Sequence, residues 1–312
     1  MAKPIVVSIS HSIDPDGIGS QAILFRYFRE LKIEPIAFLA DYYNFEATLK
    51  EALTHNPNVL IISDIGINKS FLYNILEPLR ELKARKIWID HHKVSDEDRA
   101  LLEEVLNELI HDTSVCAAEL VQKRFMPNDA ISKKIASIGH NGDFDVQDRL
   151  TDIFYTLIDF YRFTNEKLER VREFLIMGDF EDRELVDEYL NAYKVFEAER
   201  DRIKITFKTI TFSGKTIAIA DSELLPRGKV TKFLSEICSE DIFMAIDTNN
   251  FRIGLRSDSF DVAALAMEFN GGGHKHRSGF TFKGALNQDN SLNSDFLEKF
   301  ENAILKISEQ SG

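Results

Sequence analysis

Short apolar runs alternate with longer stretches of helical apolar spacing over the first 90 residues. The short runs predict buried strands at Pro4–Ser10, Pro35–Ala40, Val59–Ser63 and Lys86–Ile89. The longer stretches predict helices over Ile18–Leu31, Asn44–His55 and Lys69–Lys83, the last interrupted at Pro78. Such alternation is typical of a parallel sheet with right-handed crossovers and helices on both faces. We therefore expect an N-terminal doubly wound α/β domain.

The pattern changes twice in the rest of the chain. From Glu97 to about Lys204 strand signals fade and helical spacing dominates. The part after Asn165 is dense in charged residues, which is typical of a solvated helix face, with a partner surface as the alternative. Strand-like runs return at Ile205–Phe212, Thr216–Ala220, Ile242–Asp247 and Phe251–Leu255, and a helix is predicted over Phe296–Ile307. We expect a first domain over 1–190, a helical connector over 191–204 and a smaller α/β domain over 205–312.

The amino-acid composition limits the kinds of molecule that the protein is expected to bind. The 312 residues include 51 acidic and 38 basic side chains, a formal charge of −13, which disfavours binding of long nucleic acid by bulk electrostatics. A short anionic substrate remains compatible where metal ions or a local basic cluster supply positive charge. The two cysteines cannot form a disulfide framework, and no apolar run reaches the roughly 18 residues of a membrane span. We expect a cytoplasmic protein without a membrane partner, and homodimerisation stays open.

Acidic residues and histidines follow three of the predicted strands. The first strand runs into His11, Asp14 and Asp16, the third into Asp64, and the fourth into Asp90–His92. Because parallel strands share one carboxyl edge, where ligands bind, we expect four carboxylates and three imidazoles in one crevice. Taken singly, Asp64 is also typical of a helix cap, and the residues from Asp14 are also typical of a β-turn.

This density of like charge predicts bound cations, because close carboxylates repel one another unless a cation neutralises them. Oxygen ligands alone suit Mg²⁺ or Ca²⁺, whereas added imidazole favours Mn²⁺, Fe²⁺, Co²⁺ or Zn²⁺. The ligands exceed the needs of one ion, which favours two ions about 3.5–4 Å apart. Such a pair generates a hydroxide that attacks phosphorus, so the residues predict hydrolysis of phosphoryl esters.

The order of these motifs resembles that of the DHH phosphoesterase superfamily. Three of its motifs match His11…Asp14–Gly17, Ile61–Asp64 and Asp90–His92, and the fourth matches Gly139 and Asp143. Near the other end, Gly271–His274 resembles the signature of the associated C-terminal domain, DHHA1, and Arg256-Ser257 resembles the Arg-Ser step that accompanies it. Two positions depart from the family: His11 precedes Asp14 by three residues rather than four or two, and Arg277-Ser278 replaces two small residues before Gly279.

The resemblance implies two sets of metal ligands that share one residue. These are His11, Asp14 and Asp64 for one ion, and Asp16, His91, Asp143 and the bridging Asp64 for the other. For Asp143 the alternative is a helix-end cap, with Asp145 as the substitute ligand. Mn²⁺ is the expected metal, with Mg²⁺ or Co²⁺ as alternatives.

Two further residues of the DHH motif are implied to act in catalysis. Asp90 would position His91, and His92 would face the substrate as an electrostatic or proton-donating group near the leaving oxygen.

A basic island in the second domain predicts a phosphate anchor. The glycine run exposes backbone N–H groups able to cradle a phosphate, and Arg256 would add a bidentate contact. The predicted substrate-binding residues are Arg256, Ser257, Gly272, Gly273, His274 and Arg277. A tight turn with solvated basic residues is the alternative.

Together these observations predict a divalent-metal-dependent phosphodiesterase acting on short RNA or DNA oligonucleotides or on dinucleotides, cyclic ones included. It would release mononucleotides, resembling the oligoribonucleases called nano-RNases. The charge and the lack of a visible basic groove disfavour a long-strand exonuclease of the RecJ type. The alternatives are an inorganic pyrophosphatase or polyphosphatase, whose relatives carry a different C-terminal domain, and a non-catalytic nucleotide sensor.

Overall fold

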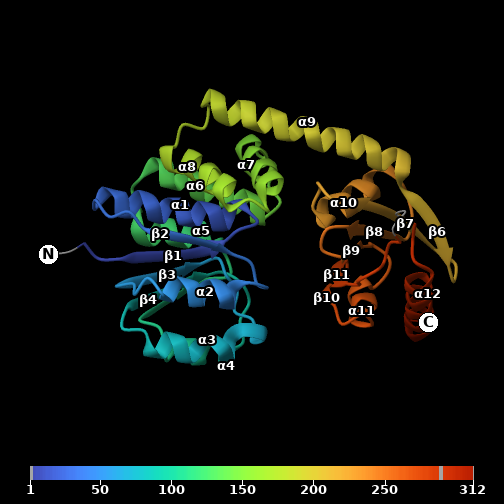
Figure 1. Cartoon of the computed structure of the whole chain (residues 1–312), viewed down its shortest axis with the longest axis horizontal. Helices are drawn as coiled ribbons and strands as arrows, with labels where there is room; N and C mark the ends of the chain where they lie inside the picture. Colours follow the sequence, from blue (N-terminus) through green and yellow to red (C-terminus); the bar gives the residue numbers. More distant parts are fainter. Residues whose placement is uncertain (1–2, 288–290, 312) are drawn as a thin grey trace. The chain divides into compact units, whose positions relative to one another are not determined.

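The structure, a computed structural model, describes residues 3–287 and 291–311. The chain forms two compact units, Met1–Ala192 and Tyr193–Gly312, and the division falls within the long helix α9 (Arg183–Thr206). Each unit has its own sheet and its own apolar core (Figure 1). The finer division, with a connector over 191–204, stays a prediction.

The N-terminal unit is built on a five-stranded parallel sheet in the order β2-β1-β3-β4-β5. Its strands are β1 (Val6–His11), β2 (Ile36–Ala40), β3 (Val59–Ser63), β4 (Arg85–Asp90) and β5 (Glu108–His111). The first four agree with the predicted strands. The sequence pattern missed β5, a half-buried edge strand of four residues. Strand order reverses between β1 and β3, and the carboxyl ends at such a switch point flank the ligand crevice of doubly wound sheets.

Helices cover both faces of this sheet (Figure 1). One face packs against α1 (Pro15–Glu30), α5 (Ala117–Phe125), α6 (Ala130–Asp143), α7 (Arg149–Tyr161) and α8 (Asn165–Met177). The other packs against α2 (Phe45–Leu53), α3 (Lys69–Glu81) and α4 (Asp96–Glu103). Strand side chains alternate between the two cores: Ile61 lies in the first and Ile62 in the second. The predicted doubly wound architecture is therefore present.

In this unit the structure excludes one alternative, the β-turn at Asp14, and corrects one expectation, the interruption at Pro78. Residues from Asp14 form a helix start rather than a β-turn: Pro15 is the first residue of α1, and the Asp14 carboxylate accepts the Gly17 N–H at 2.9 Å. Pro78 does not interrupt α3, because it lies in the last turn and the missing hydrogen bond falls on the solvent-exposed residue Asn74. Ile75 and Leu79 hold that turn against the core.

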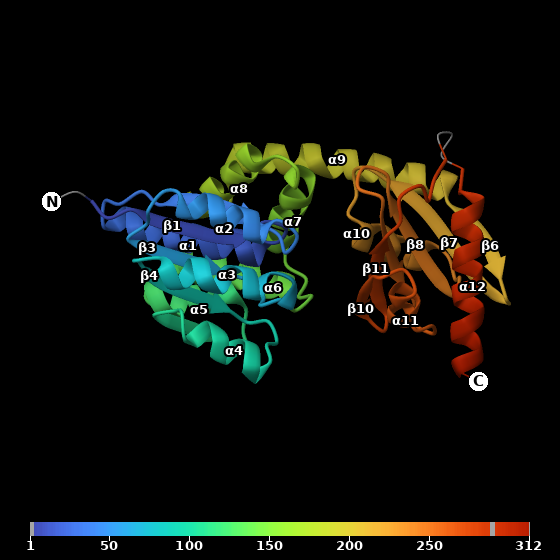
Figure 2. The ribbon, with the colours of Figure 1, turned by 60° about the horizontal axis from the view of Figure 1, so that its bottom comes forward.

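The C-terminal unit is built on a six-stranded mixed sheet in the order β10-β11-β9-β8-β7-β6. Its strands are β6 (Lys208–Phe212), β7 (Lys215–Ser222), β8 (Ile242–Asp247), β9 (Arg252–Arg256), β10 (Gly272–His274) and β11 (Arg277–Thr281). Figure 2 shows α10 (Arg227–Ile237) and α12 (Ser294–Ser311) on opposite sides of this sheet, and α11 (Val262–Met267) joins the core on the α12 side. Among the helices of the described residues, none combines the length and the apolar character needed to cross a bilayer.

Candidate metal centre

The carboxyl ends of β1, β3 and β4 bring together all six residues predicted as metal ligands. Their ligand atoms form groups in which all atoms lie within 4.8 Å of one another. The groups are His11, Asp14 and Asp64; Asp16, His91 and Asp143; and Asp64, His91 and His92. His11 is the last residue of β1, Asp14 and Asp16 lie at the start of α1, Asp64 and His91 directly follow β3 and β4, and Asp143 comes from the last turn of α6. That these side chains bind metal stays a prediction.

Asp64 occupies the shared position between the first two groups. Its Oδ2 lies 3.5 Å from Nδ1 of His11, and its Oδ1 lies 3.4 Å from Nε2 of His91. The residue has a positive φ of 57°, a left-handed conformation that costs a non-glycine residue roughly 1–2 kcal/mol. The strained turn after β3 thus aims one carboxylate oxygen at each histidine, as a bridging ligand requires.

The first group leaves buried polar atoms without hydrogen bonds. His11 is 5% exposed, and neither of its ring nitrogens has a hydrogen-bond partner, although Nδ1 lies only 2.8 Å from Oδ2 of Asp14. Oδ2 of Asp64 is also buried without a partner. Each such group costs about 1–3 kcal/mol when left unsatisfied. A divalent cation would satisfy these lone pairs, and the mixed oxygen and imidazole donors suit Mn²⁺ or Co²⁺.

The second group is built around a carboxylate fixed by the backbone. Asp16 is fully buried and accepts the N–H groups of Ala117 and Ala118, at the start of α5, at 2.8 and 2.7 Å. Nε2 of His91 lies 3.7 Å from Asp16 and 3.2 Å from Asp143. Asp143 ends α6, where the helix dipole disfavours a negative charge, so helix capping does not account for it. The group contains Asp143 and not Asp145.

Asp90 and His111 hold His92 through three hydrogen-bonding contacts. Its Nδ1 lies 2.8 Å from Oδ1 of the fully buried Asp90, whose Oδ2 accepts the backbone N–H of His92 at 3.2 Å. The carbonyl of His92 accepts from Nε2 of His111, at the end of β5, at 2.7 Å. The printed contacts of Asp90 go to His92, because the turn after β4 folds His92 back onto that carboxylate while the ring of His91 faces Asp64. The expected positioning of His91 by Asp90 stays a prediction.

Tyr42 belongs to the site although it is part of no motif in the sequence. Its hydroxyl lies 3.3 Å from Nε2 of His92, and its ring packs edge-on against His11 at 5.6 Å. Tyr42 follows β2, whose carboxyl end lies at the same sheet edge as those of β1 and β3. That position was the one available signal, and a tyrosine in a loop carries no ligand pattern of its own.

Comparison with known proteins now places this centre in a family. Residues 4–143 match the family model for the DHH family, N-terminal domain. Over this range the N-terminal unit matches the DHH family, and we refer to the unit as the DHH domain. This confirms the resemblance carried by the DHH motifs, and members of the DHH family are phosphoesterase hydrolases. The match ends before the glycine run, so the DHHA1 resemblance stays a prediction.

The similarity to known proteins covers more of this chain than the DHH domain alone. "Uncharacterized protein R106" of Acanthamoeba polyphaga mimivirus is 22% identical over 303 residues, covering 89% of this chain and 68% of that protein. The crystal structure of exonuclease RecJ bound to manganese has a TM-score of 0.64 at 16% identity, over 96% of this chain and 90% of that one. An exopolyphosphatase-related protein from Bacteroides fragilis has a TM-score of 0.54 at 19% identity, over 97% and 92%. At these identities the two structures show a shared fold, which confirms the predicted α/β architecture.

The electrostatics of the DHH centre favour proton uptake in the absence of a cation. Burial and the charges of Asp64 and Asp14 raise the pKa of Asp16 to about 8. Burial and the charges of Asp16 and Asp14 raise the pKa of Asp143 to about 7. For His91, burial acts in the opposite direction, but the surrounding carboxylates outweigh it and raise the pKa to about 9. A divalent ion bound here therefore displaces protons at neutral pH.

We expect Mn²⁺ to stabilise the protein, and to do so more at pH 8 than at pH 6. The pKa of Asp16 is raised from 3.8, so its stabilising contribution without metal is complete below that value and is lost as the pH rises through about 8. Metal replaces the proton over the same range. At a hundred times Kd the gain is about 2.7 kcal/mol, or roughly 5–10 °C in Tm. Thermal melts at both pH values test this, and equal shifts at the two would contradict it.

Gly139 lets α6 approach Asp16. A Cβ at this position would lie 2.8 Å from Oδ1 of Asp16 and 3.2 Å from Cβ of Ala118. Gly139→Ala is therefore expected to displace the carboxylate and to weaken Mn²⁺ binding about 10-fold, as loss of a supporting contact typically does. Calorimetric titration measures the affinity, and Gly228→Ala is the control because a Cβ there meets nothing within 4 Å. Unchanged affinity in Gly139→Ala would show that Asp16 does not hold metal.

Three predicted substrate-binding residues form one row on the C-terminal sheet. Cross-strand register places His274 opposite Arg277, and Arg277 opposite Arg256. Their side chains thus lie side by side on one face across β10, β11 and β9. Gly272 and Gly273 are exposed in β10, and Gly273 has a φ of 139°, which disfavours any side chain. The glycine run is therefore an edge strand rather than a loose turn.

Ser257 departs from the prediction. It is fully buried, its hydroxyl donates to the Asp241 carbonyl at 2.6 Å, and its oxygen accepts the N–H groups of Ser259 and Phe260. The hydroxyl is used to fix the loop after β9 and does not face substrate. The Arg-Ser step therefore supplies one half-buried side chain in the basic row, Arg256, and one structural anchor, Ser257.

Proposed function

We propose that this protein is a divalent-metal-dependent phosphodiesterase that hydrolyses short oligonucleotides or dinucleotides to mononucleotides. The observation that supports this most is the position of Asp64, whose two oxygens face histidines of two separate ligand groups at the switch point of a DHH domain. We propose Mn²⁺ as the metal because of the mixed donor set and because the similar exonuclease RecJ was solved with manganese.

The two ions, when bound, supply the positive charge that neutralises the phosphodiester and activates the attacking water. The protein's own side chains position the ligands and supply the proton for the leaving group. Asp16 and Asp64 fix the positions of the ligand sets through backbone contacts and a strained turn. His92 holds a proton for the leaving oxygen: burial acts against its charged form, but the hydrogen bond and charge of Asp90 outweigh this and raise its pKa.

The basic row His274, Arg277 and Arg256 supports a phosphorylated substrate, since guanidinium groups bind phosphate bidentately. Short substrates are favoured because the chain as a whole carries a charge of −13, which repels a long polyanion. The fold shared with an exopolyphosphatase-related protein makes inorganic polyphosphate the second candidate substrate.

A substrate panel with Mn²⁺ tests the proposal. Each of a dinucleotide, a tetranucleotide, a 30-nucleotide strand, pyrophosphate and a linear tetraphosphate is incubated with the protein, with and without chelator. We expect chelator-sensitive release of mononucleotides, fastest from the two short substrates. Phosphate release from the inorganic substrates alone would select the second candidate. Absence of any turnover would select a nucleotide sensor.

A further inference from the structure

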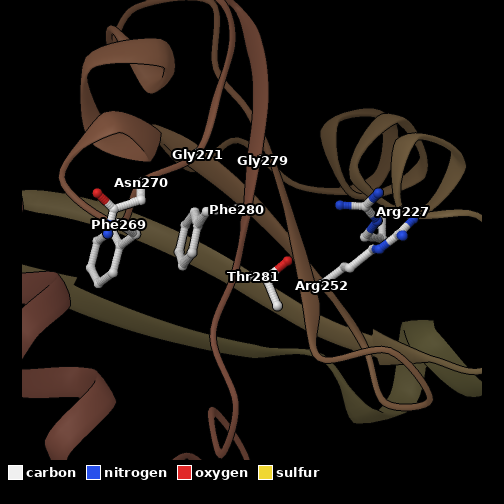
Figure 3. Close-up of a pocket in the computed structure, with 8 residues that line it drawn as sticks. All are labelled: Arg227, Arg252, Phe269, Asn270, Gly271, Gly279, Phe280 and Thr281. Carbon is white, nitrogen blue, oxygen red and sulfur yellow. The ribbon is translucent and has the colours of Figure 1, made fainter. Parts of the chain in front are cut away.

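A pocket lies beside the basic row on the C-terminal sheet. It has a volume of about 580 Å³, within the range of small-ligand sites. Figure 3 shows Arg227 and Arg252 on one side of it, Phe269 and Asn270 on the other, and Thr281 between them. None of the residues that line it is acidic, although the chain is acidic overall. Two guanidinium groups in such a pocket point to an anionic ligand.

By strand register, the pocket residues Thr281 and Arg252 lie two cross-strand rows away from the predicted phosphate anchor, the row of His274, Arg277 and Arg256. The next row on the same face consists of glycines only: Gly272 opposite Gly279, and Gly279 opposite Gly254. The row after that pairs Thr281 with Arg252. Arg252 and Arg256 are four residues apart in β9, a separation of about 13 Å along the strand. At this separation the two rows suit different phosphates of one ligand.

Gly272, Gly279 and Gly254 form a side-chain-free stretch of the sheet, the glycine floor, and the Arg227 side chain packs against it. A Cβ on Gly254 would lie 2.8 Å from Cβ of Arg227, and one on Gly279 would lie 3.3 Å from its Nη1. The same Nη1 donates to the carbonyl of Ile253 at 3.3 Å. Above Gly272 a Cβ would meet nothing within 4 Å. Glycines inside strands are unfavourable and mark close approach of another group, so this floor positions Arg227 and leaves open space beside it.

We propose that the pocket of Arg227 and Arg252 is a second phosphate-binding site, which holds another phosphate of the same short oligonucleotide. The glycine floor would lie under the two nucleosides between these phosphates, and Phe269 and Asn270 would contact the nucleoside beyond. This inference rests on the proposed function and adds to it a preference for substrates long enough to reach both rows.

Binding to the full chain tests the proposal without turnover. In an Asp64→Asn background, Kd is measured by fluorescence anisotropy for a labelled 5′-phosphorylated tetranucleotide, and by competition for a 5′-mononucleotide and a linear tetraphosphate. Arg252→Gln is expected to weaken the tetranucleotide at least about 10-fold and the mononucleotide less than about 2-fold. Arg252→Lys keeps the charge but loses the bidentate contact, so an intermediate loss is expected.

The control removes a charge from the opposite edge of the same sheet. Lys208→Gln, in β6, is expected to change tetranucleotide binding less than about 2-fold. An equal loss in Lys208→Gln and Arg252→Gln, with melting curves unchanged, would reduce the effect to bulk charge and overturn the proposal. So would a 10-fold loss for the linear tetraphosphate, which is too short to reach both rows. Because binding is measured without cleavage, failure of wild-type protein to release mononucleotides counts against the proposed function alone.

Discussion

Asp64→Asn is expected to lower kcat by about 1,000-fold and to abolish the rise of Tm with Mn²⁺. The substitution removes the charge of the one carboxylate that faces both His11 and His91, and metal-ion catalysis of this kind is worth several kcal/mol. Asparagine tolerates the left-handed conformation at φ 57° as aspartate does, so the turn after β3 should keep its shape. Steady-state kinetics and thermal melts measure the two effects.

Asp112 offers the matched control for this substitution. It follows β5 at the same edge of the sheet but lies outside all three ligand groups, and its carboxylate caps a turn through Ser114. Asp112→Asn should leave kcat within about 2-fold, because only an exposed turn contact is changed. Turnover in Asp64→Asn comparable to that in Asp112→Asn would remove the shared-ligand assignment.

His92→Gln is expected to lower kcat by about 100- to 10,000-fold with a smaller change in KM, because a proton donor acts in the transition state. The supporting carboxylate gives a second readout. Asp90→Asn removes the hydrogen bond and charge that raise the pKa of His92, so the alkaline limb of the pH–rate profile should move to lower pH. Initial rates with a dinucleotide over pH 5–10 measure the loss of kcat in His92→Gln and the shift of the alkaline limb in Asp90→Asn.

His55→Gln is the control for a histidine away from the centre, since His55 is exposed just beyond the C-terminal end of α2. It should leave both kcat and the pH profile unchanged. If Asp90→Asn lowered the rate without moving the alkaline limb, Asp90 would support the fold of the turn rather than the proton on His92.

Much of the DHH domain could be predicted because its information is local in the sequence. Buried parallel strands appear as short apolar runs, and the shared carboxyl edge of such strands groups Asp64 with His11 and His91. What the sequence could not give is the direction of side chains in the turns. The fold of the loop after β4 decides that Asp90 meets His92, and only the strand order brings Tyr42 to the same edge.

The C-terminal unit shows the same limit more strongly. The glycine run is predictable as a special backbone segment, but its pairing with β11 comes from tertiary structure. Arg227 and Arg252 lie 25 residues apart and share no motif, so their approach over Gly254 depends on packing of α10 against β9. Ser257 was misassigned because an Arg-Ser pair does not reveal which of two neighbouring side chains turns inward.

Anomalous diffraction from a crystal grown with Mn²⁺ tests the central claim most directly. We expect two manganese peaks about 3.5–4 Å apart, one beside His11 and Asp14 and the other beside Asp16, His91 and Asp143, with a carboxylate oxygen of Asp64 directed at each. A single peak, or peaks away from Asp64, would contradict the two-ion centre and the hydrolysis inferred from it.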